Sequence, residues 1–254
     1  RFNQLTTLNV SKNSALYILS CTNNKLTNLD VTNKSALKYL FCENNQITTL
    51  DISNDIALYE FHCSGNRLTR LDVSHNDSLT ILGCSDNLLT SLDLSPISSL
   101  SSMVCNGNHL TTLDVSNNTS LTGLACNDNQ LSSLDVSSNP ALEWLYCANN
   151  QLTSLDISHN NALKKLFCGD NQLTSLGVSN LLHLNILHCD GNQLTSLDLT
   201  NNISIGQDFE GMGMCYLSIQ NMPGLKKVCV WTMPFPSEEI KVCTDGSPNV
   251  YFTT

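Results

Sequence analysis

The sequence predicts a right-handed solenoid with a parallel sheet on its concave face, mostly extended or 3₁₀ structure on its convex face, and little helix. The main observation is a set of cysteines at a fixed interval of 21 residues. These are Cys21, Cys42, Cys63, Cys84, Cys105, Cys126, Cys147, Cys168 and Cys189. Each is followed three residues later by an asparagine, from Asn24 to Asn192. An unbroken register over nine copies indicates that every turn of the chain stacks on the previous one.

A short strand is expected just before each cysteine. In the copy that ends at Cys147, Leu145 and Cys147 alternate with Trp144 and Tyr146. This alternation is typical of a strand with one buried face, so the leucine and the cysteine should point inward. Copies stacked in register would then form parallel strands about 4.8 Å apart.

A sharp corner is expected after each strand. The residue before the repeated asparagine is Asn, Asp or Gly in every copy, and these types tolerate the left-handed conformation. They are Asn23, Asn44, Gly65, Asp86, Gly107, Asp128, Asn149, Asp170 and Gly191. The asparagine itself is expected to satisfy backbone groups of adjacent turns. The second half of the repeat leaves little room for a helix, so extended or 3₁₀ structure is expected there.

The cysteine ladder is predicted to consist of buried, reduced thiols. Neighbours in a parallel sheet have Cβ atoms nearly 5 Å apart with parallel directions, whereas a disulfide needs about 3.8 Å and a turned dihedral angle. A row of thiols also cannot converge on the tetrahedron that zinc prefers. The cysteines are therefore interpreted as small hydrophobic side chains, and no metal or cofactor is expected.

A row of aspartates explains most of the net charge of −10. Eight of the 22 acidic residues occupy one repeat position, which leaves 14 acids against 12 bases. They are Asp30, Asp51, Asp72, Asp93, Asp114, Asp135, Asp156 and Asp198. A calcium-binding β-roll would need a glycine-rich nonapeptide, so an Asx turn is the favoured interpretation. No basic stripe is present for nucleic acid.

The predicted domains are a solenoid of about nine to ten turns over residues 1–202, which starts in mid-repeat, and a cap of degenerate last turns over residues 203–254. The start suggests a piece of a longer chain or a component of a surface complex. No apolar run is long enough for a membrane span. Three cysteines lie off the ladder, and one internal disulfide or three buried thiols both remain open. They are Cys215, Cys229 and Cys243.

The repeat matches the leucine-rich-repeat signature, with cysteine in the third leucine position. It resembles bacterial surface and secreted leucine-rich-repeat proteins, and its ladder is similar to that of the cysteine-ladder internalin subgroup. The segments 150–158 and 222–231 are similar to secreted repeat proteins of Bacteroidota. The resemblance implies export to the cell surface or the medium, often by the type IX route, with a sorting domain beyond Thr254.

Outward strand positions are not needed for packing and are the candidate binding residues. The candidates on the concave face form two aromatic patches: Tyr39, Phe41, Tyr59, Glu60 and His62, then Trp144, Tyr146, Lys165, Phe167 and His188. Between them we expect a bare saddle of small residues, which includes Gly83 and Gly123. Exposed aromatic residues on a rigid sheet are typical anchors for a partner.

Three functions remain open. The first is a non-enzymatic recognition or adhesion module that binds a protein or peptide, and the second is a glycan-binding module. The third is a passive spacer, in which Phe41 beside His62 and Tyr146 beside Phe167 only stabilise the sheet. Enzymatic activity is not expected, because Glu60 and Glu143 would lie roughly 20 Å apart, too far for paired carboxylates.

Overall fold

The computed structural model describes residues 3–207, 215–233, 235, 236 and 240–254. The chain forms two compact units. Unit 1 comprises residues 1–121 and 128–130, and unit 2 comprises residues 122–127 and 131–254. All regular structure in the described residues is β-strand, so none of these residues forms a helix that could cross a membrane.

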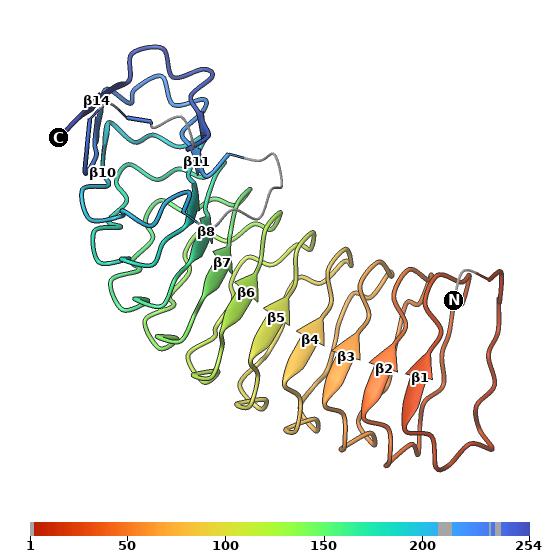
Figure 1. Ribbon diagram of the computed structural model, residues 1–254. Helices are drawn as coiled ribbons and strands as arrows, with labels where there is room; N and C mark the ends of the chain where they lie inside the picture. Colours follow the sequence, from red (N-terminus) through yellow and green to blue (C-terminus); the bar gives the residue numbers. More distant parts are fainter. Residues whose placement is uncertain (1–2, 208–214, 234, 237–239) are drawn as a thin grey trace. The chain divides into compact units, whose positions relative to one another are not determined.

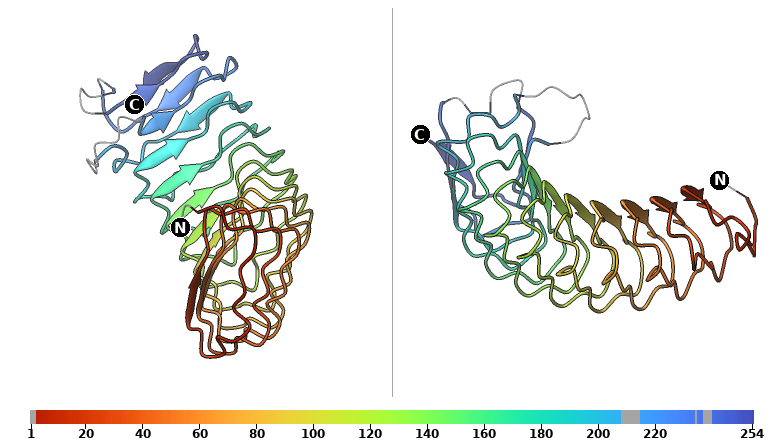
Figure 2. Two further views of the ribbon diagram at one scale, coloured as in Figure 1. Left: turned by 90° about the vertical axis from the view of Figure 1, so that its right-hand side faces the viewer. Right: turned by 90° about the horizontal axis from the view of Figure 1, so that it is seen from below.

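Unit 1 is a stack of short parallel strands in chain order (Figure 1). They are β1 (Ile18–Ser20), β2 (Tyr39–Phe41), β3 (Glu60–His62), β4 (Ile81–Gly83) and β5 (Ser102–Val104). Neighbouring strands pair one repeat apart, so Leu19 lies opposite Leu40, and Leu40 opposite Phe61. The right view of Figure 2 shows these strands side by side, each followed by a return loop.

Unit 2 carries two sheets. Its main sheet holds β6 (Gly123–Ala125), β7 (Trp144–Tyr146), β8 (Lys165–Phe167), β9 (Ile186–His188), β11 (Leu217–Ser218) and β13 (Val242–Cys243). The second sheet holds β10 (Ser196–Asp198), β12 (Lys227–Cys229) and β14 (Tyr251–Thr253). It lies on the opposite side of unit 2 from β8 and β11 (Figure 1). The predicted parallel solenoid is therefore confirmed.

The return side of each turn differs in one detail from the prediction. Extended structure there forms regular strands only as β10, β12 and β14, and the other described return segments consist of turns and bends without 3₁₀-helix. The predicted cap contributes β11 to β14. Its role as a separate capping domain stays a prediction.

The ladder cysteines lie in the core and are free thiols, as predicted. Burial raises the pKa of Cys21 to about 11 and that of Cys105 and Cys147 to about 12. Since a thiol must ionise to act as a nucleophile or metal ligand, these side chains stay protonated at neutral pH. The ladder serves packing.

The asparagine after each cysteine joins two turns, as expected. Asn45 donates from Nδ2 to the carbonyl of Cys42 at 3.0 Å and to that of Cys21 at 3.1 Å. Its Oδ1 accepts the backbone N–H of Leu26 at 3.0 Å. The preceding corner residues have positive φ, for example 54° at Asn44 and 67° at Gly65. These bonds satisfy buried backbone groups that the corner would otherwise leave without partners.

A second asparagine ladder was missed in the sequence. Asn76 donates from Nδ2 to the carbonyls of Ile52 and Asp55 at 3.1 and 3.0 Å. The same pattern recurs at Asn118, Asn160 and Asn202. Its 21-residue interval was visible, but the apolar residues Ile97 and Leu181 interrupt the row.

Asp55 occupies one position of this second ladder, and its side chain is fully buried. Its Oδ1 accepts the backbone N–H of Lys34 at 3.2 Å, while its Oδ2 has no hydrogen-bond partner. Burial raises the pKa of this carboxyl to about 6. A neutral acid therefore fits this site better than a carboxylate.

The aspartate row forms Asx turns, as predicted. Asp30 Oδ1 accepts the backbone N–H of Thr32 at 3.0 Å and its hydroxyl at 2.7 Å. The hydroxyl and then the backbone N–H lower the pKa of Asp30. The carboxylate thus stabilises its own turn.

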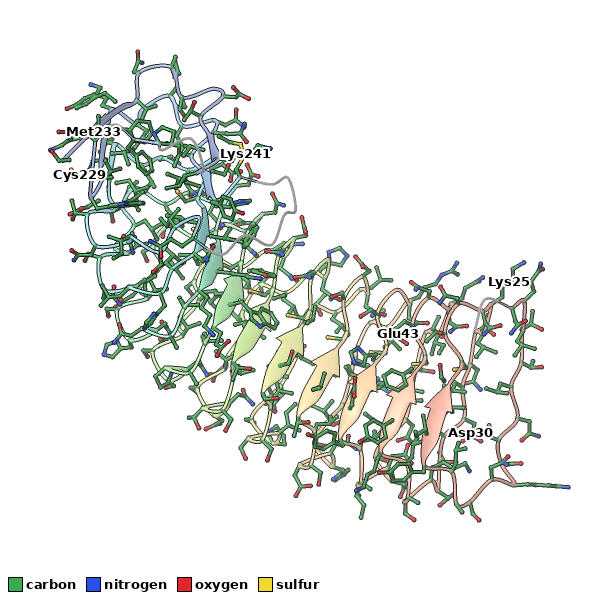
Figure 3. All side chains as sticks on the ribbon, viewed as in Figure 1. Lys25, Asp30, Glu43, Cys229, Met233 and Lys241 are labelled. Carbon is green, nitrogen blue, oxygen red and sulfur yellow. A yellow bond between two sulfur atoms is a disulfide. The ribbon has the colours of Figure 1, made fainter. Side chains whose placement is uncertain are left out.

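The cysteines off the ladder are now assigned. Cys215 and Cys243 form a disulfide between the segments of β11 and β13, while Cys229 on β12 is a free thiol. Figure 3 shows Cys229 on the side of the second sheet and Lys241 on the side of β11. Nearby, the ring of Phe235 packs at 5.1 Å from Trp231 and at 5.1 Å from Phe252.

Candidate functional site

The outward side chains of the main-sheet strands form a surface in each unit, which we call the sheet surface. In unit 1 it carries the tyrosine patch, defined as Tyr17, Tyr39, Phe41, Tyr59, Glu60 and His62. In unit 2 it carries the tryptophan patch, defined as Trp144, Tyr146, Lys165, Phe167 and His188. Each patch brings together the candidates predicted for it.

The three tyrosines of unit 1 form a row across successive turns. The Tyr39 ring packs edge-on at 5.6 Å from Tyr17 and at 6.1 Å from Tyr59. Lys38 Nζ lies 5.7 Å from the centre of the Tyr17 ring. The pKa of Tyr39 is raised, first by burial and then by the adjacent Tyr17 phenol. Tyr17 and Tyr59 are among the exposed large side chains of the chain.

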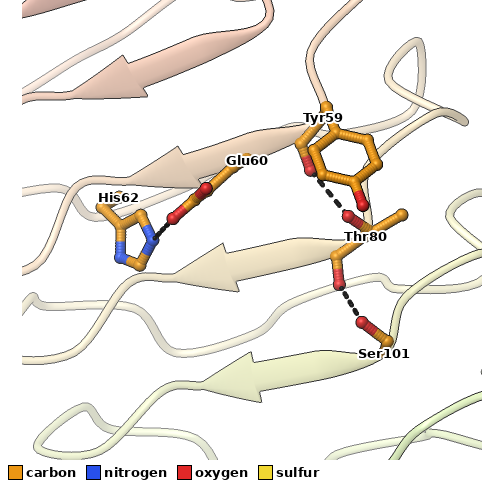
Figure 4. Close-up of polar contacts among 5 residues, drawn as sticks. All are labelled: Tyr59, Glu60, His62, Thr80 and Ser101. Atoms are coloured by element: carbon orange, nitrogen blue, oxygen red, sulfur yellow. Dashed lines mark hydrogen bonds and ion pairs between the residues drawn. The ribbon is translucent and has the colours of Figure 1, made fainter.

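A second group in the tyrosine patch combines a ring stack with a hydrogen bond between a histidine and a glutamate. Phe41 stacks on His62 at 5.4 Å with an interplanar angle of 22°. His62 Nε2 lies 2.9 Å from Glu60 Oε1, because residues two apart point to the same side of β3 (Figure 4). The one carboxylate on this part of the surface therefore already has a partner within the protein.

Hydroxyl groups beside the tyrosine patch tie turns together. Thr80 Oγ1 donates to the carbonyl of Tyr59 at 3.1 Å, and Ser101 Oγ donates to the carbonyl of Thr80 at 3.0 Å (Figure 4). These hydrogens satisfy backbone oxygens of the preceding turn. Their first role is therefore structural.

The tryptophan patch is one continuous row of rings. Ring centres are 5.3 Å apart for Trp144 and Tyr146, 4.7 Å for Tyr146 and Phe167, and 4.3 Å for Phe167 and His188. His188 Nε2–H donates to the carbonyl of Cys215 at 2.7 Å. Each ring is held on at least one side, so the row is fixed before any partner arrives.

The predicted bare saddle is partly wrong, because its glycines lie beneath aromatic rings. A Cβ atom on Gly83 would lie 2.7 Å from His62 Nδ1. A Cβ atom on Gly123 would overlap the indole of Trp144. The sequence predicted an uncovered surface at these residues. In the structure His62 of β3 packs against Gly83, and Trp144 of β7 packs against Gly123.

Lys165 is the single charged residue at the outward strand positions of β7 to β9. It is half-buried and lies in register between Trp144 and Ile186. Among the described residues, no hydrogen bond or ion pair engages its ammonium group. The adjacent Lys164 is paired instead, with its Nζ 2.9 Å from Glu143 Oε2.

The arrangement offers contact chemistry. The ladder thiols are buried and protonated, and the Asx-turn carboxylates accept hydrogen bonds from their own turns. No three His, Cys, Asp or Glu side chains in the described part of the chain converge on a metal-sized space. At the outward positions of the main-sheet strands that the structure describes, the charged residues are Glu60 in unit 1 and Lys165 in unit 2, and aromatic rings surround each of them.

The chain is similar to several solved structures. One is the functional domain of InlJ from Listeria monocytogenes, which also includes a cysteine ladder, at 35% identity and a TM-score of 0.83 over 99% of this chain. The chain spans about half of that structure, 49% of its length. No protein-family model and no curated protein matches the sequence.

Two further structures show the fold alone. A leucine-rich-repeat protein of Leptospira interrogans is 20% identical, with a TM-score of 0.71 over 95% of this chain and 61% of that one. An internalin, inlF, of Listeria monocytogenes is 17% identical, with a TM-score of 0.69 over 99% and 84%. The chain therefore has the leucine-rich-repeat fold, and its neighbours include internalins. An origin in Bacteroidota stays a prediction.

Proposed function

We propose that this chain is a non-enzymatic extracellular recognition module that binds a protein or peptide through its sheet surface. The observation that carries the proposal is the tryptophan patch, in which four rings form a preassembled row on a rigid sheet. Fixed aromatic side chains lose little conformational entropy on binding and are typical interaction anchors. The leucine-rich-repeat neighbours also suggest a protein-interaction module.

The arrangement of Trp144 favours binding over a purely structural role. Its indole lies across Gly123 on the adjacent strand β6, where any side chain would overlap the ring. Glycine within a strand weakens that strand and often marks a close approach. A passive spacer gains no stability from a half-exposed tryptophan whose indole requires a glycine on the adjacent strand.

An extracellular location is supported by the Cys215–Cys243 disulfide. Structural disulfides persist in oxidising compartments and are rare in the cytosol. Neighbours of the internalin type fit the same location. Mass spectrometry of alkylated protein from culture medium and cell-surface fractions tests both the location and the bond.

The binding test compares the double variant Trp144→Ala/Tyr146→Ala with a matched control, Tyr251→Ala. Tyr251 is exposed on β14 in the second sheet of the same unit. Peptides are selected from a displayed random library on the wild-type protein. The affinity of each selected peptide for wild type, for the double variant and for Tyr251→Ala is then measured by fluorescence anisotropy. We expect the double variant to weaken binding by about tenfold or more and Tyr251→Ala to leave it unchanged.

Equal affinity of wild type and double variant would exclude this patch as the binding surface, and the proposed function, which rests on the patch, would fail. A glycan array run in parallel distinguishes the alternative ligand class. Binding of a sugar through Trp144 with no peptide selected would replace the protein-binding proposal. Circular dichroism of both variants checks that the solenoid is intact.

A further inference from the structure

We infer that the tryptophan patch recognises an acidic extended segment of a protein partner, with a carboxylate on Lys165 and an apolar side chain on the neighbouring rings. The inference rests on the proposed function and names the chemistry of its partner. It starts from the charge of the patch. Lys165 is the single charged side chain on the outward positions of β7 to β9, and among the described residues nothing pairs its ammonium group.

The surroundings of Lys165 make this charge effective. Trp144 and Ile186 flank it in register on the adjacent strands, and the row of Tyr146, Phe167 and His188 runs alongside. A partner that covers these apolar side chains also removes water from the ammonium. An ion pair then forms in a lower effective dielectric than at an open surface, where it contributes little. The same desolvation penalises a partner with a neutral or positive group at this point.

The tyrosine patch provides the contrast within the chain. Its outward charge, Glu60, already lies 2.9 Å from His62 Nε2. A positively charged group of a partner gains less by binding Glu60, because it must compete with His62 for that carboxylate. A cation without a partner among the described residues therefore distinguishes the tryptophan patch and gives it a preference for acids.

The spacing on β8 indicates an extended segment. Lys165 and Phe167 are two residues apart on one strand, and a strand rises about 3.3 Å per residue, so their side chains are about 6.6 Å apart. Side chains two apart in an extended peptide have the same spacing. A segment with the pattern acid-x-apolar, in either chain direction, thus places its carboxylate on Lys165 and its apolar side chain on Phe167 and Tyr146.

The test uses a displayed library of short random peptides, selected on the whole chain and counter-selected on Trp144→Ala/Tyr146→Ala. We expect selected peptides to be enriched in Asp or Glu two residues from an aromatic or aliphatic residue. Their affinity, measured by fluorescence anisotropy, should fall about tenfold for Lys165→Gln and further for Lys165→Glu, and it should fall with added salt.

The matched control is Lys164→Gln. Lys164 is the adjacent, exposed residue that is paired with Glu143, so its replacement should change peptide affinity less than about twofold. Thermal unfolding of the free Lys165 variants should match wild type, since the ammonium has no partner among the described residues. This separates loss of binding from loss of fold.

Two results would overturn the inference in different ways. Peptides that need Trp144 but show no acid enrichment, or bind Lys165→Gln as well as wild type, would refute the acidic partner while the proposed function stands. If no peptide binds wild type better than Trp144→Ala/Tyr146→Ala, the proposed function fails and the inference fails with it.

Discussion

The tyrosine patch and the tryptophan patch are built on the same repeat, yet they differ in how their rings are connected. In the tyrosine patch the rings fall into two groups, the Tyr17–Tyr39–Tyr59 row and the Phe41–His62 stack. In the tryptophan patch four rings form one row. Its single charge, Lys165, also has no partner in the part of the chain that the structure describes, whereas Glu60 contacts His62. One scaffold therefore carries a patch whose outward charge contacts a neighbouring side chain and a patch whose outward charge has no such contact among the described residues.

The largest expected effect concerns the connection of the rings. Phe167 contacts a ring on each side, Tyr146 and His188, whereas Phe41 contacts one, His62. We expect Phe167→Ala to lower the free energy of unfolding by about 2–3 kcal/mol and Phe41→Ala by about 1–2 kcal/mol. Urea unfolding followed by circular dichroism measures both. Equal losses would show that the continuous row has no special stability.

The second prediction concerns the floor beneath each ring. Gly123→Ala forces the Trp144 indole off β6 and should cost about 1–3 kcal/mol, with a shift in tryptophan fluorescence recorded in a Trp231→Phe background. Gly83→Ala should cost less, because only the edge of His62 must move. Gly177→Ala is the control, since nothing lies within 4 Å of its added Cβ. If Gly123→Ala behaves like Gly177→Ala, the indole does not lie over β6.

The third prediction concerns Asp55, an acid in the buried asparagine ladder of unit 1. Because burial raises its pKa to about 6, the folded state binds the proton more tightly than the unfolded chain. Its contribution to stability is full below about pH 4 and is lost as the pH rises through 6. Asp55→Asn should therefore raise the free energy of unfolding by about 1–2 kcal/mol at pH 8, where the carboxyl group is charged, and by less at pH 4, where it is largely protonated. The gain at pH 8 is limited because the backbone N–H of Lys34 stabilises the carboxylate.

Asp51→Asn is the control for this pH series. Hydrogen bonds from Ser53 lower the pKa of Asp51, so its stabilising contribution is present at neutral pH and is lost on acidification. The two variants should thus change stability in opposite directions at neutral pH. A gain from Asp55→Asn that does not vary with pH would contradict a buried titrating acid.

The smallest expected effects concern the two charges. Glu60→Gln replaces the half-buried carboxylate that contacts His62 Nε2 by a neutral, weaker acceptor and should cost about 0.3–1 kcal/mol in the free protein. Lys165→Gln should cost less than about 0.5 kcal/mol, because the ammonium has no partner in the described structure. A larger loss for Lys165→Gln would reveal an internal partner and weaken the case for an external one.

Much of the scaffold could be predicted because one period governs it. The 21-residue interval predicted the parallel strands, the buried cysteines, the positive φ at the corners and the asparagine bonds between turns. The second asparagine ladder escaped because Ile97 and Leu181 interrupt it. The candidate residues lie together within each unit, and their role in binding stays a prediction. The glycines at positions 83 and 123 were misread, because the sequence does not show whether the space left by a missing side chain is empty or filled by a neighbouring ring.

The sequence by itself determined which side chains point inward, which turn the corner and which face outward, because strand alternation and repeat register are local properties. The tertiary structure decided what the outward residues do. The T-shaped contact of Tyr146 with Phe167 and the indole over Gly123 depend on side-chain directions across neighbouring turns. The Glu60–His62 contact within β3, and the lack of a partner for Lys165 among the described residues, likewise depend on side-chain directions that the sequence does not show. The two ring contacts join residues 21 apart in the chain, and their geometry is set only when the turns stack.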